Sequence, residues 1–283
     1  MTQLLRGSEV AEALQSTITS EVRDLKARGI EPVLAIVRVG ERADDISYER
    51  GAVRRAELLG VGVRSVVLPD DCTTMELLEI MEDLSEDDDV HGILLFRPLP
   101  AHIDEDAVRK ALVPTKDVDG ITDLSLAGVF SNTATGFAPC TAQACMEILD
   151  YYGIELAGKR TVVVGRSLVV GRPVAMLLLA RHATVTIAHS HTADLPGVVK
   201  AADLVIACVG SAEMLDASYL AAGQTVIDVG INVAADGSLL GDVSREDAEG
   251  IVQAITPVPG GVGTVTTSVL IKNVVEAASE ILG

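Results

Sequence analysis

The sequence predicts an α/β protein with two domains, each built on a mainly parallel sheet flanked by helices. Three observations lead to this prediction. The chain has 283 residues, which suits one large domain or two small ones. Its composition is 48% hydrophobic, enough for packed cores and too apolar for a disordered chain. Short aliphatic runs alternate with helical segments in both halves, which is the pattern of βαβ units.

The first half is expected to alternate helix and strand. Aliphatic runs bounded by Gly or Pro predict buried strands, and polar caps predict helix starts. Thr73, followed by Glu76 three residues later, has the pattern of a capping box. We expect helices at Ser8–Gly29, Asp45–Leu59, Thr73–Leu84 and Asp104–Leu112, and strands at Val33–Val39, Gly62–Leu68 and Val90–Leu95.

The segment Val113–Ala138 is expected to be rich in loops and to hold the domain boundary, near residues 120–140. The alternation then resumes, with β-branched runs that favour buried parallel strands. We expect helices at Thr141–Tyr152, Gly171–Arg181 and Val262–Leu282, and strands at Thr161–Val164, Thr184–Ala188, Leu204–Val209 and Thr225–Val229.

The chain is strongly acidic, with 22 Lys and Arg residues against 41 Asp and Glu residues and a formal net charge of −19. Nucleic acids and anionic membranes attract basic clusters, so we expect neither as a partner. The longest apolar run, Val174–Ala180, is too short to span a bilayer. Met1–Arg6 lacks the apolar region of a signal peptide, so the expected compartment is the cytoplasm. The four cysteines have no zinc-ligand spacing; we expect free thiols and no metal.

A glycine loop between a predicted strand and a predicted helix is the best local sign of a ligand. The strand ends at Gly165, and the helix opens near Gly171 with Pro173 in its first turn. Glycines let backbone N–H groups approach a diphosphate, whose charge the helix N-terminus favours. Because the spacing is not G-x-G-x-x-G, a tight turn without a ligand is the alternative. Arg166 and Arg172 are either phosphate contacts or solvated side chains.

The next predicted strand ends in His189-Ser190-His191-Thr192. This position usually carries the group that recognises the ribose of a dinucleotide. No carboxylate is present to bind a free 2′-hydroxyl group, so the segment favours NADP over NAD. Since His189 and His191 alternate, we expect their rings on opposite sides, which argues against a shared metal.

Eight motifs occur in an order that resembles one family over nearly the whole chain. They are Pro98-Leu-Pro100, Lys116-Asp-Val-Asp-Gly120, Pro139-Cys-Thr141, Val163-Val-Gly165-Arg-Ser, Val170-Gly171-Arg-Pro173, Val229-Gly-Ile-Asn232, Gly241-Asp-Val243 and Ile255-Thr-Pro-Val-Pro-Gly-Gly-Val-Gly263. The set resembles the bifunctional methylenetetrahydrofolate dehydrogenase/methenyltetrahydrofolate cyclohydrolase family. The resemblance implies NADP-dependent oxidation of 5,10-methylenetetrahydrofolate and hydrolysis of the product to 10-formyltetrahydrofolate, in one-carbon metabolism and purine biosynthesis.

The resemblance also implies a domain organisation and a set of site residues. Residues 1–139 and 265–283 would form a folate-binding catalytic domain, residues 140–264 a Rossmann-type NADP-binding domain, and the protein a homodimer. Tyr48 and Asp119 would be catalytic and contact the folate, together with Pro259 and Gly260. The residues assigned to the cofactor are Gly165, Arg166, Ser167, Gly171, Arg172, Ser190 and Ile231.

Each residue assigned to the folate also has a simpler structural explanation. Asp119 could cap the turn of Asp-Val-Asp-Gly. Tyr48 could be an ordinary half-buried aromatic residue of a helix. The loop that holds Pro259 and Gly260 could be a rigid connector to the last helix.

The sequence departs from the family pattern at two positions that belong to one catalytic network of the family. The family has the pattern Tyr-x-x-x-Lys. This chain has Ala52 at the lysine position, four residues after Tyr48. Phe96 stands where the family has the glutamine that braces the lysine, and Arg97 is a new cation beside it. Ring opening of the methenyl group needs proton transfer, which alanine cannot supply. Hydride transfer depends mainly on positioning and can survive the change.

We therefore expect an NADP-dependent methylenetetrahydrofolate dehydrogenase with weak or absent cyclohydrolase activity. Two alternatives stay open. One is a non-catalytic relative that binds folate or NADP as a partner or regulatory subunit. The other is a dehydrogenase for a different substrate, with Arg97 meeting an anionic group.

Overall fold

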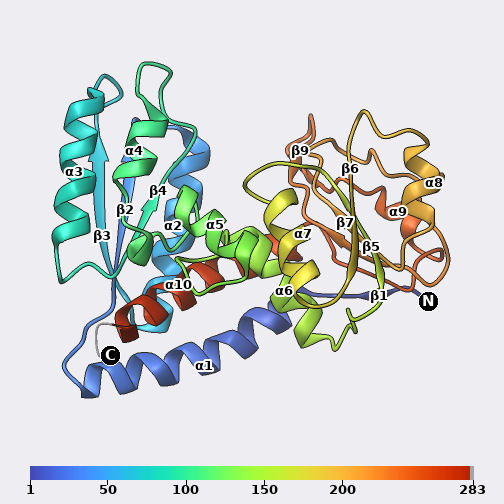
Figure 1. Ribbon diagram of the computed structural model, residues 1–283, viewed down its shortest axis with the longest axis horizontal. Coiled ribbons are helices and arrows are strands. Elements are labelled where there is room, and N and C mark those ends of the chain that lie inside the picture. The colour runs from blue at the N-terminus through green and yellow to red at the C-terminus, as the bar shows by residue number, and fades with distance from the viewer. Residues whose placement is uncertain (281–283) are drawn as a thin grey trace. The chain divides into compact units, whose positions relative to one another are not determined.

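The structure is a computed structural model that describes residues 1–280 (Figure 1). It divides into two compact units, each of which contains one parallel sheet. The six-stranded unit comprises Met1–Glu12 and Thr141–Thr266, and the three-stranded unit comprises Ala13–Cys140 and the chain from Thr267 onward. Residues 281–283, which belong to the expected domain 265–283 and the end of its helix, lie outside the described residues.

The three-stranded unit contains a parallel sheet of order β3-β2-β4. Its strands match the expected runs closely, because short aliphatic runs of this kind are buried on both faces. The strands are β2 (Val33–Val39), β3 (Gly62–Leu68) and β4 (Gly92–Leu95). The helices are α1 (Gly7–Ala27, its later part), α2 (Ala43–Leu59), α3 (Thr74–Glu86), α4 (Glu105–Ala111) and α5 (Asp123–Ser131), with a 3₁₀ turn at Pro114–Lys116.

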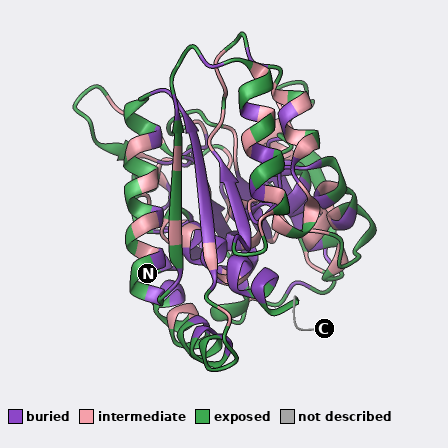
Figure 2. Ribbon diagram, turned by 90° about the vertical axis from the view of Figure 1, so that its left-hand side faces the viewer, coloured by how far each residue is buried: buried purple, intermediate pink, exposed green. Residues whose placement is uncertain are grey.

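The core of this unit lies along β2 and β4, whereas much of the edge strand β3 is exposed (Figure 2). Ala35, Val37, Ile93 and Leu95 form a cluster with side chains of α3 and α4. The expected capping box is confirmed, because the Thr73 hydroxyl accepts from the Glu76 backbone and the Glu76 carboxylate accepts from the Thr73 backbone. The chain therefore enters α3 at the predicted residue.

Helix α5 was not predicted, because Val113–Ala138 was expected to be rich in loops. Its signal is local: the Thr122 hydroxyl accepts from the Ser125 backbone, and Asn132 ends the helix in the left-handed region. The helix has no clear apolar periodicity. The buried Asp117 carboxylate also supports its start, and the sequence pattern did not predict these contacts.

The six-stranded unit has the sheet order β1-β11-β8-β7-β5-β6, and its neighbouring strands pair in parallel. The strands are β1 (Gln3–Leu4), β5 (Arg160–Val164), β6 (Thr184–Ala188), β7 (Leu204–Ala207), β8 (Thr225–Asp228) and β11 (Ala254–Ile255), and a small antiparallel hairpin adds β9 (Asn232–Val233) and β10 (Leu239–Leu240). The helices are α6 (Cys140–Tyr151), α7 (Gly171–Ala180), α8 (Leu195–Lys200), α9 (Arg245–Ala248) and α10 (Val262–Glu280, its first residues).

The N-terminal residues belong to the six-stranded unit, whereas the resemblance had implied that they belong with the folate-binding domain. The reason is the pairing of β1 with β11, in which Gln3 lies opposite Ala254 and Leu4 opposite Ile255. Such two-residue strands carry no periodic pattern, so they were not predicted. Neither were β9, β10 and the short helices α8 and α9. No helix of residues 1–280 is long and apolar enough to cross a membrane.

The strands that carry the cofactor motifs end in one row. Val164 pairs with Ala188 of β6 and with Ala207 of β7, and Ala207 pairs with Asp228 of β8. The residues that follow these strand ends therefore share the carboxyl edge of the sheet. The chain order reverses between β5 and β7, and open α/β sheets bind ligands at such a switch point. We call this edge the dinucleotide edge.

Candidate active site

The centre of the dinucleotide edge is a tight loop between β5 and α7. Gly165 has a φ of +133°, and a Cβ at Gly171 would lie 2.5 Å from the carbonyl oxygen of Gly165. A Cβ at Gly165 would in turn lie 2.3 Å from the carbonyl oxygen of Cys208 on the neighbouring strand end. The N-terminus of α7 therefore lies against the end of β5, an arrangement that lets backbone N–H groups meet a diphosphate.

Ser167 and Arg172 brace this loop from within. The Ser167 Oγ accepts hydrogen bonds from the backbone N–H of Val170 at 3.1 Å and of Gly171 at 3.4 Å. The Arg172 Nε donates to the carbonyl oxygen of Arg166 at 3.1 Å. Their assigned contact with the cofactor stays a prediction, and the structure adds that both hold the loop in shape.

The two histidines at the end of β6 lie against each other. The backbone N–H of His191 donates to Nδ1 of His189 at 3.1 Å, and the rings meet edge to face with centroids 5.9 Å apart. The expectation of opposite sides is wrong, because the strand ends at Ala188 and a turn replaces its alternation. The turn is closed by the backbone N–H of Thr192, which donates to the His189 carbonyl oxygen.

The residues assigned to a 2′-phosphate are accessible at this end of the edge. Arg166 and Ser190 are both exposed. Desolvation is the largest cause that lowers the pKa of His189, and the charge of nearby Arg166 lowers this pKa further. The guanidinium of Arg166 thus supplies a positive charge that persists at all physiological pH values, near the His189 imidazole and the adjacent Ser190. Together with the glycine loop, these groups fit a phosphorylated dinucleotide.

At the other end of the edge lies a cavity of about 240 Å³, lined by three further residues that were assigned to the cofactor or the folate. Ile231, Pro259 and Gly260 all line it, and Pro259 and Gly260 are exposed. The loop is held against the start of α1, because the Gly7 backbone N–H donates to the Gly260 carbonyl oxygen at 2.9 Å. The structure therefore brings one residue assigned to the cofactor beside two assigned to the folate.

In the three-stranded unit, Asp119 lies on a turn that leaves its carboxyl group half-buried. Burial is the main cause that raises its pKa to about 6, and the negative charge of Asp117 adds to the shift. Cys140 and Arg97 act in the opposite direction. A carboxyl group that titrates this close to neutrality is typical of a functional site.

Tyr48 of α2 lies near Asp119. Desolvation raises the pKa of the Tyr48 hydroxyl well above its ordinary value, and the charge of Asp119 adds to the effect. The hydroxyl is therefore a hydrogen-bond donor at neutral pH. The ring of Phe96 meets the ring of Tyr48 edge to face, with centroids 5.7 Å apart, and Ala52 is completely buried one turn along α2. The face of α2 that carries Tyr48 thus has no ionisable group at position 52.

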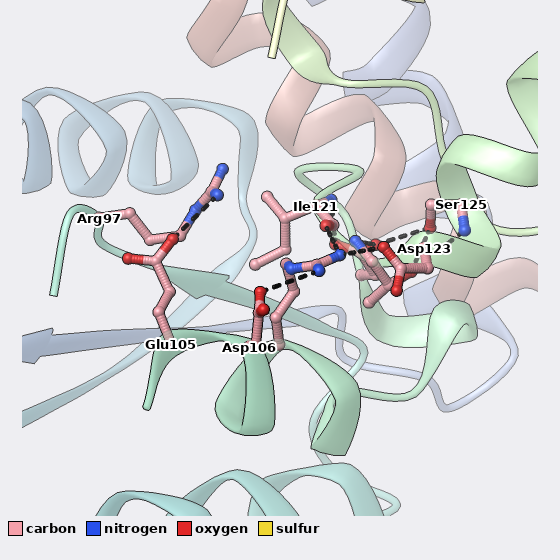
Figure 3. A network of polar contacts seen from close by, with 9 residues as sticks. Arg97, Glu105, Asp106, Ile121, Asp123 and Ser125 are labelled. Atoms are coloured by element: carbon pink, nitrogen blue, oxygen red, sulfur yellow. Dashed lines mark hydrogen bonds and ion pairs between the residues drawn. The ribbon is translucent and has the colours of Figure 1, made fainter. Parts of the chain in front are cut away.

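Arg97 is engaged with Glu105 of α4. Its Nη1 lies 3.5 Å from the Glu105 Oε1 (Figure 3). The other carboxylate oxygen of Glu105 accepts from the Leu99 backbone N–H at 3.2 Å. A second network beside it joins Arg109 to Asp106 and Asp123. Because Glu105 partly offsets its charge, Arg97 is a weaker attractor of anions than the sequence indicated.

The side chains of Asp117, Asn273 and Cys140 support the turn that carries Asp119, and none was predicted to do so. Asp117 is fully buried and accepts from the backbone N–H of Ile121 and Thr122 and from the Ser125 hydroxyl. The Val118 carbonyl oxygen accepts from the Asn273 side chain of α10 at 2.8 Å and from the Cys140 thiol at 3.1 Å. For Asp117 the signal was its place two residues before Asp119. Asn273 had none, because it lies far away in the sequence.

The four cysteines, Cys72, Cys140, Cys145 and Cys208, are free, as the sequence predicted. Burial is the largest cause that raises the pKa of each thiol. Within residues 1–280 no group of three or more His, Cys, Asp or Glu side chains is arranged to hold a metal ion.

Comparison with protein families shows two matches that together cover most of the chain. The catalytic domain of tetrahydrofolate dehydrogenase/cyclohydrolase matches residues 5–119. The NAD(P)-binding domain of the same family matches residues 139–282. The second match contains the whole dinucleotide edge, and the first contains Tyr48, Ala52, Phe96 and Asp119.

Similar proteins cover the full length of the chain. The bifunctional protein FolD of Carboxydothermus hydrogenoformans is 48% identical over 285 residues, which cover 100% of this chain and 99% of the relative. The crystal structure of FolD from Campylobacter jejuni has a TM-score of 0.97 and 36% identity, and covers 99% of this chain and 100% of its own. The Trypanosoma brucei FolD structure, a complex with NADP and an inhibitor, has a TM-score of 0.93 and 36% identity, with 99% and 98% covered.

Proposed function

Because this chain belongs to the tetrahydrofolate dehydrogenase/cyclohydrolase family, we propose that it oxidises 5,10-methylenetetrahydrofolate to 5,10-methenyltetrahydrofolate with NADP+. The observation that carries the proposal is the complete dinucleotide edge, with two touching glycines at its centre and an exposed arginine beside them. We further propose that the second family activity, hydrolysis of the methenyl group, is weak or absent. The route belongs to one-carbon metabolism.

The cofactor is proposed to lie along the dinucleotide edge. Gly165 and Gly171 leave room for the diphosphate, and the N-terminus of α7 favours its charge. Arg166 and Ser190 would hold the 2′-phosphate, and Ile231 would contact the nicotinamide half at the cavity. When bound, NADP+ accepts the hydride that leaves the methylene carbon.

Asp119 and Tyr48 are proposed to hold the folate. An ionised Asp119 can accept two hydrogen bonds from the amino-pyrimidine edge of the pterin. The phenol of Tyr48 is protonated at neutral pH and its side chain is 37% exposed, so it can donate a hydrogen bond to the bound folate. Pro259 and Gly260 would contribute backbone and apolar surface from the cavity loop. Oxidation then depends on how these groups position the methylene carbon.

The loss of hydrolysis is proposed from the face of α2 that carries Tyr48. Water addition to the methenyl carbon needs a group that moves protons, a contribution of about 10²–10⁴-fold. Ala52 has no such group, and Phe96 packs an apolar ring against Tyr48. Arg97 is no substitute, because a guanidinium stays protonated and this one is paired with Glu105.

Two other functions are less well supported. A non-catalytic folate- or NADP-binding subunit would explain Ala52, and the product analysis below tests it, because any NADPH formed by the protein would rule it out. A dehydrogenase for another anionic substrate would need an available Arg97, and the contact with Glu105 argues against this. We also propose a homodimer, which light scattering of the purified protein would reveal as twice the mass of the chain.

The test is a product analysis. The purified protein is mixed with methylenetetrahydrofolate and NADP+, and NADPH, methenyl- and 10-formyltetrahydrofolate are followed against a control without enzyme. We expect NADPH and the methenyl product to rise together, while the formyl product follows spontaneous hydrolysis. No NADPH from folded protein would rule out the dehydrogenase. Formyl product well above the control would rule out the proposed loss of hydrolysis.

A further inference from the structure

Two buried carboxylates lie beneath the dinucleotide edge. Asp228 ends β8 and is 3% exposed, and Asp242 follows β10 and is completely buried. Neither was assigned a role. Buried carboxylates are costly unless hydrogen bonds compensate them, so the partners of these two groups show what they hold in place.

The Asp242 side chain is hydrogen-bonded to the loop that follows β7. Its carboxylate accepts hydrogen bonds from three consecutive backbone N–H groups and from one side chain. The donors are Val209 N at 2.6 Å, Gly210 N at 3.0 Å, Ser211 N at 2.9 Å and Asn232 Nδ2 at 3.0 Å. One carboxylate therefore connects the end of β7 with the segment that follows β8.

Asp228 holds Asp242 in turn. Its carboxylate accepts from the backbone N–H groups of Asp242, Val243 and Gly230, each at 3.0 Å. Burial raises the pKa of Asp228 to about 6, and these three donors counter the shift. The two carboxylates thus form a chain of contacts that runs from β8 through the Gly241-Asp-Val243 turn to the loop after β7.

Two glycines make this close approach possible. A Cβ at Gly230 would lie 2.3 Å from the Asp242 Cγ, and a Cβ at Gly241 would lie 1.9 Å from the Asp228 Oδ2. Any side chain at either position would displace a carboxylate. The glycines of the Val229-Gly-Ile-Asn232 and Gly241-Asp-Val243 motifs therefore leave the space that the two carboxylates occupy.

The loops that are held in this way lie at one end of the dinucleotide edge. The β5 loop is central, with the β6 end on one side and the β7 and β8 ends on the other. In such sheets the diphosphate lies at the first βα loop, and the adenosine ribose lies at the end of the next strand in the chain. The nicotinamide half consequently falls on the side of β7 and β8, where Ile231 lines the cavity.

We propose that Asp242, with Asn232, is a positioning residue for the nicotinamide half of the dinucleotide. Its carboxylate holds the Val209–Ser211 loop and the segment around Ile231 in the spacing that this half requires. The inference rests on the proposed binding of NADP, but it does not depend on the folate or on either reaction.

The test compares a whole ligand with a fragment. Calorimetry of the full-length protein measures the affinity for NADP+ and for adenosine 2′,5′-diphosphate, which lacks the nicotinamide half. We expect Asn232→Ala to weaken NADP+ about tenfold, the cost of one hydrogen bond to a charged group, and to leave the fragment within about twofold. Asp242→Asn should weaken NADP+ more, because its amide group would face N–H donors.

The matched control is Asp236→Ala, in the turn of the same β9–β10 hairpin. Asp236 is exposed, and its carboxylate accepts from the backbone N–H and the hydroxyl of Ser238, so both ligands should bind as to the wild type. Equal weakening of NADP+ and the fragment by Asn232→Ala would overturn the proposal, since it would indicate general loosening. Unchanged NADP+ affinity in both variants would overturn it as well. Wild-type protein that binds neither ligand would instead contradict the proposed function.

Discussion

Ala52 is the residue on which the proposed loss of hydrolysis mainly rests. Its side chain is completely buried, and the ring of Phe96 lies against Tyr48 one turn away. Ala52 lies one turn from Tyr48 on α2 and Phe96 meets the Tyr48 ring, and neither side chain carries a polar group. A lysine at position 52 would need the polar group at position 96 as well, so we treat the pair as one unit.

Restoring both positions should restore hydrolysis. We expect the double variant Ala52→Lys with Phe96→Gln to hydrolyse methenyltetrahydrofolate about 10²-fold faster than the wild type, the size of a general acid–base contribution. The decay of methenyltetrahydrofolate absorbance measures the rate, and NADPH formation reports that the variant is folded. The matched control, Ala52→Met with Phe96→Gln, adds similar bulk without an amine. Equal rates in the two variants would contradict the explanation.

The raised pKa of Asp119 predicts a pH dependence. Its pKa is about 6, so the carboxylate becomes protonated as the pH falls through this value and loses one acceptor. We expect kcat/KM for the folate to fall below pH 6, by up to about tenfold per pH unit, since this ratio reports the free enzyme. Asp119→Asn should be slower throughout and lack this inflection. A wild-type profile that stays flat through pH 6 would argue against a role for the carboxylate.

The same group is expected to cost stability at neutral pH. The folded-state pKa of Asp119 lies above its ordinary value, so the native state holds the proton more tightly than the unfolded state. The contribution of this group to the free energy of unfolding therefore falls as the pH rises from about 4 to about 6, by up to about 3 kcal/mol. A binding carboxylate kept in a desolvated place commonly has such a cost.

At the scale of elements, short connections position the site more than the regular elements do. The turn with Asp119 is held by Asp117, by the start of α5 and by Asn273 of α10. The diphosphate loop is held by the contact of Gly171 with Gly165. In both places a backbone segment keeps its shape because buried groups occupy the space around it.

A methyl group at the β5–α7 junction should therefore weaken cofactor binding. In Gly171→Ala the Cβ would lie 2.5 Å from the Gly165 carbonyl oxygen, so the loop must shift. We expect NADP+ affinity to fall by more than about tenfold, measured by calorimetry, because the helix N-terminus moves away from the diphosphate. Gly51→Ala is the control: that Cβ would meet nothing within 4 Å, and the helix should gain about 0.5–1 kcal/mol. Similar NADP+ affinity in both variants would refute the role of this contact.

At the scale of the whole molecule, the net charge of −19 opposes compactness and repels anionic ligands. Folates and NADP are anions, so their proposed binding would rely on local positive groups such as Arg166. Salt screens charge repulsion beyond about 8 Å at physiological ionic strength, which leaves contacts at hydrogen-bond distance largely intact.

The charge predicts that salt stabilises the protein. We expect Tm, followed by circular dichroism at pH 7.5, to rise by several degrees between about 0.01 and about 0.3 M NaCl, as self-repulsion is screened. The control is the same titration near pH 4.5, the isoelectric point, where the effect should nearly vanish. A Tm that falls with salt at pH 7.5 would show that surface ion pairs outweigh the net repulsion.

Local sequence patterns predicted most of the longer helices and strands. The runs at β2, β3 and β6 were predicted to the residue, and the Thr73 capping box was predicted with its partner. These features depend on neighbours within a few residues, so composition and spacing reveal them. The family was visible for the same reason, because its motifs are contiguous.

The contacts between distant segments could be identified only in the folded structure. It joined β1 to β11, placed His189 against His191, and set Asn273 beneath the Asp119 turn. It also assembled Asp228 and Asp242 under the dinucleotide edge, with glycines where side chains would collide. No local pattern predicts these contacts, because each depends on which buried polar group finds a partner once the chain has folded.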